Sequence, residues 1–129
     1  MQTIYLLDSS AWIEYFEGSK LGSIVRQIIN DNESIIYLPS IVITEVTSKL
    51  IRKGLDASSV LKEMSMLSLP AVEKQDYFFE AGKLHAEKRV LSKNFPTADA
   101  IIQVLAQKNN AKIVTKDHHL IGPNTILLE

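Results

Sequence analysis

Four short apolar runs along the chain have the length and near-continuous hydrophobicity of strands that are buried on both faces. They are Thr3–Leu7, Ser34–Leu38, Lys112–Thr115 and 125–128. The run at 69–72 is shorter, and an edge strand is one interpretation of it. Apolar strands without polar alternation are typical of parallel sheets, so we expect a mainly parallel sheet of four or five strands.

Longer segments between these runs have the polar and apolar spacing of helices. In Lys20–Asn30, apolar residues recur at positions 21, 24, 25, 28 and 29. Capping and breaking residues place further helices at about 9–16, 40–53, 56–67, 76–91 and 98–108. Ser9 or Ser10 is the expected N-cap of the first, and Thr97 that of the last. Strands that alternate with helices predict an α/β fold, a three-layer α/β/α sandwich with helices on both faces of the sheet.

The amino-acid composition is that of a folded globular protein rather than of a disordered or membrane protein. Hydrophobic residues form 46% of the 129-residue chain and charged residues 22%, without repeats or linkers, which predicts one folded domain over residues 1–129. No apolar run could span a bilayer and no basic segment precedes the first run, so we expect a cytoplasmic protein with no membrane partner. The absence of cysteine excludes a disulfide framework and a zinc–thiolate site. The net charge of −1 argues against a protein that coats nucleic acid, but it leaves local basic patches open.

Four acidic residues fall where predicted strands end or predicted helices begin. Asp8 and Asp117 follow strands, Asp99 lies in the first turn of the last helix, and Glu45 lies within the first two turns of the helix at 40–53. In a parallel α/β sheet these positions share the edge where ligands bind. We therefore expect these four acids to form one site.

Each acid taken alone also has a structural explanation. Asp8 could cap the helix that follows it, and Asp99 could complement the positive end of its own helix. Glu45 could be an ordinary surface residue and Asp117 a turn residue. Four such coincidences at one sheet edge are less expected than a single acidic site.

A cluster of carboxylates requires a counter-charge, and a hard divalent cation is the usual one. Oxygen ligands without cysteine favour magnesium, manganese or calcium over zinc. The reaction indicated by such a site is hydrolysis of a phosphodiester bond, with water activated by the metal ion.

Four segments, in this order and at about this spacing, resemble the motifs of PIN domains. They are LDSS at 7–10, ITEV at 43–46, ADAII at 98–102 and IVTKD at 113–117. The resemblance covers essentially the whole chain, and it is nearest to short stand-alone members, the VapC-type toxins of toxin–antitoxin pairs. It implies a Mg²⁺- or Mn²⁺-dependent ribonuclease that forms a homodimer and is inhibited by a small antitoxin.

The resemblance also implies roles for particular residues. Asp8, Glu45, Asp99 and Asp117 match the catalytic, metal-binding acids. Ser9 and Thr115 match hydroxyl positions that support the first and last acids by hydrogen bonding. The candidate RNA contacts are Lys49, Lys116 and His118, and a solvated surface is the alternative for each.

Several features leave alternatives open. Family members often carry an aromatic residue after the last acid, where this chain has His118 and His119, so the role of that pair is undecided. Trp12 and Phe16 share a helical face and predict core or dimer packing. A dimer or antitoxin groove is expected to use some apolar residues of the helix at 40–53. These are Ile41, Val42, Val46, Leu50 and Ile51.

Two other functions compete with the nuclease. One is a non-catalytic PIN-like module that binds RNA or protein. The other is a receiver-like signalling domain, which the single acid at the end of the first strand disfavours, because receivers carry an adjacent acidic pair there.

Overall fold

The computed structural model describes residues 1–129 and contains one five-stranded sheet in the order β3-β2-β1-β4-β5. All four strand pairs are parallel. The strands are β1 (Thr3–Leu7), β2 (Ser34–Leu38), β3 (Leu69–Pro70), β4 (Lys112–Thr115) and β5 (Thr125–Leu127). The strand order reverses at β1, because β2 and β3 extend the sheet on one side of it and β4 and β5 on the other. The carboxyl ends of β1 and β4 therefore form the switch point where α/β sheets bind ligands.

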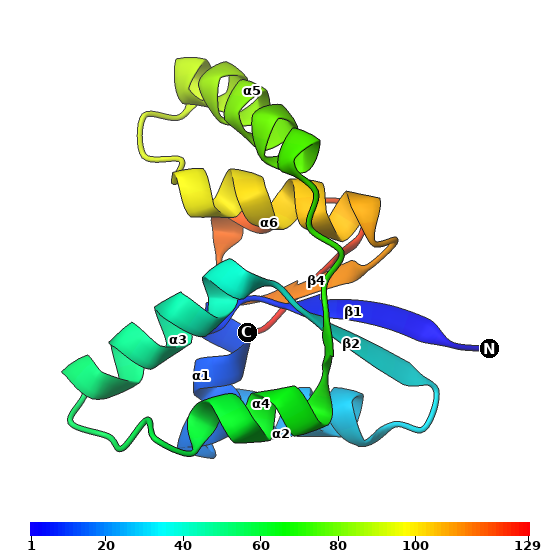
Figure 1. Cartoon of the computed structure of the whole chain (residues 1–129), viewed down its shortest axis with the longest axis vertical. Helices are drawn as coiled ribbons and strands as arrows, with labels where there is room; N and C mark the ends of the chain where they lie inside the picture. Colours follow the sequence, from blue (N-terminus) through cyan, green and yellow to red (C-terminus); the bar gives the residue numbers. More distant parts are fainter.

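Helices cover both faces of this sheet (Figure 1). They are α1 (Ser9–Glu17), α2 (Lys20–Asn30), α3 (Ser40–Arg52), α4 (Val60–Leu67), α5 (Gln75–Leu91) and α6 (Thr97–Lys108). Helix α6 packs on β4 and carries α5 on its outer side, whereas α1 packs against α2 and α3 (Figure 1). The three-layer α/β/α sandwich with a parallel sheet is confirmed. Each of the six helices is too short or too polar to cross a membrane.

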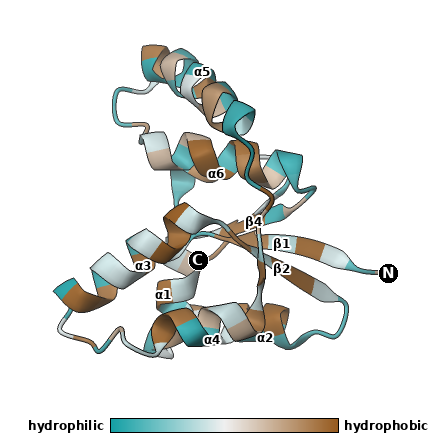
Figure 2. Cartoon of the chain, in the orientation of Figure 1, coloured by the Kyte–Doolittle hydropathy of each residue, from teal (hydrophilic) through white to brown (hydrophobic).

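A core of 21 buried residues lies between the layers. Trp12 is fully buried in it and stacks on Phe16, with ring centroids 5.9 Å apart, so this pair packs within the core. A smaller cluster around Phe95 joins α5 to α6. Figure 2 shows hydrophobic residues along the strands, whereas α5 mixes hydrophobic and hydrophilic residues along its length. Helix α5 therefore covers α6 rather than contributing an apolar face to the main core.

The apolar residues expected to serve a partner on α3 belong mostly to the core. Val42, Val46 and Leu50 are buried, and Ile41 packs against the same cluster. Ile51 is the exception, with 59% of its surface exposed. Three of the five residues are thus buried in the main core, where they hold α3 in place.

The N-caps of α1 and α6 differ from the residues expected from the sequence. The N-cap of α1 is Asp8, whose side chain accepts a hydrogen bond from Ala11 N, so the prediction of Ser9 or Ser10 as the cap was wrong and the alternative that Asp8 caps this helix is confirmed. The N-cap of α6 is Pro96, and Thr97 is already the first helical residue. A 3₁₀-helix, η1 (His118–Leu120), follows β4 and was not predicted.

Candidate active site

The four predicted acids lie together at the switch point between β1 and β4. Asp8 follows β1, Asp117 follows β4, Asp99 lies in the first turn of α6, and Glu45 lies on α3. All four line one cavity of about 450 Å³. The expectation that they share one edge of the sheet thus matches the geometry.

Asp8 is buried and its carboxylate is held on both oxygens. Ser10 Oγ donates to Asp8 Oδ1 at 2.6 Å, and Ala11 N donates to the same oxygen at 3.0 Å. The Thr115 hydroxyl donates to Asp8 Oδ2. Burial raises the pKa of Asp8, and the hydrogen bonds from Ser10, Thr115 and Ala11 oppose that rise. The chain therefore fixes the orientation of this carboxylate before any ligand binds.

The hydroxyl residues around the site contact different acids from those that the family resemblance implied. Ser10, not Ser9, hydrogen-bonds to Asp8, whereas the Ser9 side chain acts on Glu45 and lowers its pKa. Thr115 donates to Asp8 and also accepts from the backbone N–H of Asp117 at 2.8 Å. Thr115 thus connects the first acid to the last. The one-residue shift from Ser9 to Ser10 depends on where α1 begins, which the sequence left open.

Asp99 is the least satisfied of the four acids. Its residue is only 8% exposed, yet Oδ2 has no hydrogen-bond partner. Burial, a hydrogen bond with Asp117, and the charges of Asp117, Asp8 and Glu45 raise the pKa of Asp99 to about 8. A buried oxygen without a partner is costly unless a cation or proton balances it. This atom indicates that the site is built to receive a cation.

Glu45, on α3, is the fourth acid that lines the cavity. Burial raises its pKa, and the charge of Asp8 adds to the rise, while the Ser9 hydrogen bond and Lys49 oppose it. Its side chain is partly exposed and faces the same cavity as the aspartates. Carboxylate oxygens from four separate elements form a ligand set that suits a hard divalent ion.

Basic residues border the acids. Lys49, Lys53 and Lys116 line the cavity, with Lys116 Nζ 3.3 Å from Glu14 Oε2 and Lys53 paired with Glu17. A second hollow next to Glu45 is lined by Lys49 and Arg52. Two of the three lysines are thus paired with glutamates, and Lys49 forms no such ion pair.

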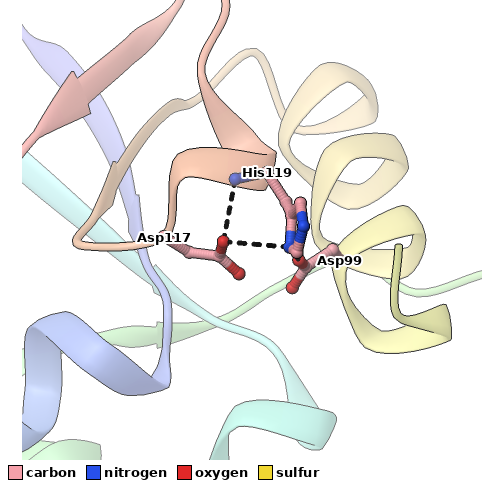
Figure 3. Close-up of side chains that lie close together, drawn as sticks. All are labelled: Asp99, Asp117 and His119. Carbon is pink, nitrogen blue, oxygen red and sulfur yellow. Dashed lines mark hydrogen bonds and ion pairs between the residues drawn. The ribbon is translucent and has the colours of Figure 1, made fainter. Parts of the chain in front are cut away.

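Two residues near the acids were not among the predicted site residues, although the role of the His118 and His119 pair was left open. Glu14 lines the cavity and pairs with Lys116. His119 places Nδ1 3.3 Å from Asp117 Oδ1 and 3.5 Å from Asp99 Oδ2 (Figure 3). His118, the histidine predicted to contact RNA, is exposed and does not line the cavity. The doubled histidine after Asp117 was the only signal of His119, and sequence alone could not say which of the two faces the acids.

Comparison with known proteins assigns the class. Residues 5–122 match the family model of the PIN domain, and the chain belongs to that family. The match confirms the resemblance seen in the four motifs.

Among solved structures, the chain is similar to the crystal structure of Mycobacterium tuberculosis VapC20, a toxin that cleaves the sarcin–ricin loop. The TM-score is 0.60 with 16% sequence identity, over 85% of this chain and 85% of that chain. At this identity the likeness establishes a shared fold. No curated protein matches the chain significantly.

Proposed function

We propose that this protein is a divalent-metal-dependent endoribonuclease, the toxin of a toxin–antitoxin pair. The observation that carries the proposal is the convergence of four acids in one cavity of a PIN-domain chain, with a buried Asp99 oxygen that lacks a partner. The fold shared with VapC20 supports the choice of RNA as substrate.

The residues present suit Mg²⁺ or Mn²⁺. Asp8, Glu45, Asp99 and Asp117 would hold the ion, because their oxygens face one cavity and the set contains no sulfur ligand. When bound, such an ion supplies Lewis-acid activation of water and neutralises charge on the phosphodiester. The unpartnered Oδ2 of Asp99 is the feature of this chain that a cation would satisfy.

The chain's own groups prepare this chemistry. Ser10 and Thr115 hold Asp8 in one orientation, so no reorganisation is needed there when substrate arrives. Lys49 and Lys116 lie on the cavity wall, where they would attract the phosphates that flank the cleaved bond. The histidine proposed from the sequence as an RNA contact, His118, lies on the exposed surface beyond this wall.

The partners proposed with this function follow from the family resemblance. They are a second copy of the chain in a homodimer and a small antitoxin protein that covers the acidic cavity, with the cytoplasm as the place of action. Light scattering of the purified protein tests the dimer, and a monomer at micromolar concentration would contradict it. Inhibition by the product of a neighbouring reading frame tests the antitoxin.

The direct test is cleavage of a broad RNA panel by purified protein with Mg²⁺ or Mn²⁺, and with EDTA. We expect cleavage with metal, none with EDTA, and a loss of about 100-fold or more in Asp8→Asn and Asp99→Asn, the scale of removing one preorganised group from an active site. Asp76→Asn is the matched control, because Asp76 lies at the start of α5 outside the cavity. Full activity in Asp99→Asn would refute the assigned site, and RNA binding without cleavage would favour the non-catalytic module.

A further inference from the structure

His119 lies close to Asp99 and Asp117 but is not one of the residues that line the acidic cavity. It is absent from the side chains that form the cavity wall, yet its Nδ1 faces one oxygen of each acid (Figure 3). The three groups come from the first turn of α6, the end of β4 and η1. One ligand atom of each lies within 4.8 Å of the other two.

The fold holds the backbone of His119 in place. Asp117 Oδ1 accepts the His119 backbone N–H at 2.8 Å, which caps η1, and Leu120 anchors the same turn in the core. Gln103 Nε2 donates to the His119 carbonyl at 3.4 Å, and the buried Phe95 ring packs edge-on against the imidazole. These contacts tie η1 to α6 and direct the ring toward the acids.

The spacing of the three atoms suits neighbouring ligands of a single ion. Ligands at about 2.1 Å from an octahedral ion lie about 3 Å from each other when they are adjacent. The Nδ1–Oδ1 and Nδ1–Oδ2 separations of 3.3 and 3.5 Å need only a small contraction to reach that value. Asp99 Oδ2 is also the buried atom that has no hydrogen-bond partner, so a ligand at this point would satisfy it.

We propose that His119 Nδ1 joins Asp99 Oδ2 and Asp117 Oδ1 as a ligand of one divalent ion, and that this nitrogen makes the site prefer Mn²⁺ to Mg²⁺. The inference rests on the proposed metal-dependent function and names the ion preference of that site. Magnesium is a hard ion that takes oxygen ligands and keeps its waters, whereas imidazole binds transition metals more readily. A site of carboxylates alone has no such nitrogen to separate the two ions.

The competing role for His119 is that of an internal cation. A protonated imidazole between two carboxylates would form ion pairs with both and would have to give way when a metal ion binds. The two roles predict opposite effects of removing the ring. Truncation weakens Mn²⁺ binding if His119 is a ligand, and strengthens it if His119 competes with the ion.

The test uses the full chain, MnCl₂ and pulsed electron paramagnetic resonance. In the wild type we expect a nitrogen-14 modulation from an imidazole bound to Mn²⁺, absent in His119→Ala and unchanged in His118→Ala, the matched control on the neighbouring exposed histidine. Titration should show Mn²⁺ affinity reduced about tenfold or more in His119→Ala, the scale of removing a group that supports a metal site. Mg²⁺ affinity, measured by competition, should fall less, so that the ratio of the two affinities moves toward unity.

The outcomes separate this inference from the proposed function. Bound Mn²⁺ without nitrogen modulation, or tighter Mn²⁺ binding in His119→Ala, overturns the ligand role of His119 and leaves metal-dependent RNA cleavage standing. Failure of the wild type to bind Mn²⁺ at all overturns both. Circular dichroism of His119→Ala checks the fold, and His119→Asn provides a second variant whose loss of the nitrogen modulation must match.

Discussion

Asp8 and Asp99, at the two ends of the acidic site, are buried to a similar extent but differ in the number of hydrogen bonds that their carboxylates accept. Asp8 is 6% exposed and accepts hydrogen bonds from Ser10, Ala11 and Thr115. Asp99 is 8% exposed and leaves Oδ2 without a partner. Burial is therefore not what distinguishes the two carboxylates; the number of protein donors is.

Asp8 is therefore held in a fixed orientation by protein donors, whereas Asp99 has an oxygen that is still free to bind a cation. The donors around Asp8 belong to α1 and β4, so the same contacts that join these elements also fix the carboxylate. Asp99 faces other acids, and the nearest basic side chain to its carboxylate is His119, whose Nδ1 lies 3.5 Å from Oδ2. The Asp99 end therefore depends on a cation or a proton from outside the chain, and the Asp8 end does not.

The largest expected effect is thermal stabilisation by metal at the Asp99 end. Mn²⁺ at about 100 times its dissociation constant should stabilise the wild type by about 2.7 kcal/mol, because a ligand that binds only the folded state adds its binding free energy. Asp99→Asn should lose most of this gain, as read by differential scanning calorimetry. An equal gain in Asp99→Asn and the wild type would mean that the ion binds elsewhere.

The next effect concerns the donors at the Asp8 end. Thr115→Val should lower the free energy of unfolding by about 1–3 kcal/mol, because it leaves a buried carboxylate oxygen without its donor. Thr97→Val is the matched control, since Thr97 is exposed and makes no capping hydrogen bond at the start of α6. Urea denaturation measures both; similar values for the two variants would show that Thr115 does not support Asp8.

A smaller effect is the pH dependence of the metal-free protein. Burial and the neighbouring Asp117 raise the pKa of Asp99 to about 8, and burial raises those of Asp8 and Glu45. Between about pH 4 and pH 8 the folded state holds protons that the unfolded chain has released, so stability falls as pH rises. In EDTA, Tm should drop by a few degrees between about pH 5.5 and pH 8.5, with a flatter slope in Asp99→Asn. A Tm that rises over this interval would contradict the assignment.

The smallest expected effect is at the basic rim. Lys116→Ala should change stability by less than about 1 kcal/mol, because its pair with Glu14 is partly exposed. RNA affinity should fall nonetheless, and its dependence on salt should become shallower. Fluorescence anisotropy at several salt concentrations measures this, and an unchanged salt slope would place Lys116 outside the RNA path.

The parallel sheet and the meeting of the four acids at one edge were predictable, because both follow from apolar periodicity and from the topology of parallel α/β sheets. Lys20–Asn30 and Ser34–Leu38 have the bounds expected from apolar spacing. Asp8, Glu45, Asp99 and Asp117 meet because parallel strands end at one edge, whatever the side chains do in detail. These features depend on patterns spread over many residues.

The features that were missed depend on single dihedral angles or on distant partners. The sequence offered Asp8 as one possible cap of α1, but it did not show that Ser10 rather than Ser9 would donate a hydrogen bond to Asp8. The direction of His119 depends on the Asp117 side chain, which caps η1. Two adjacent histidines in the sequence do not show which of them turns toward the acids. The apolar residues of α3 serve the core because α1 and α4 pack against that helix, which local sequence does not show.

The proposed activity requires that the acids at this sheet edge bind a divalent metal ion. The most direct measurement is anomalous diffraction from crystals of the full chain grown with MnCl₂. We expect a manganese peak within coordination distance of Asp99 and Asp117. A peak elsewhere, or an acidic cavity with no peak at saturating MnCl₂, would contradict it.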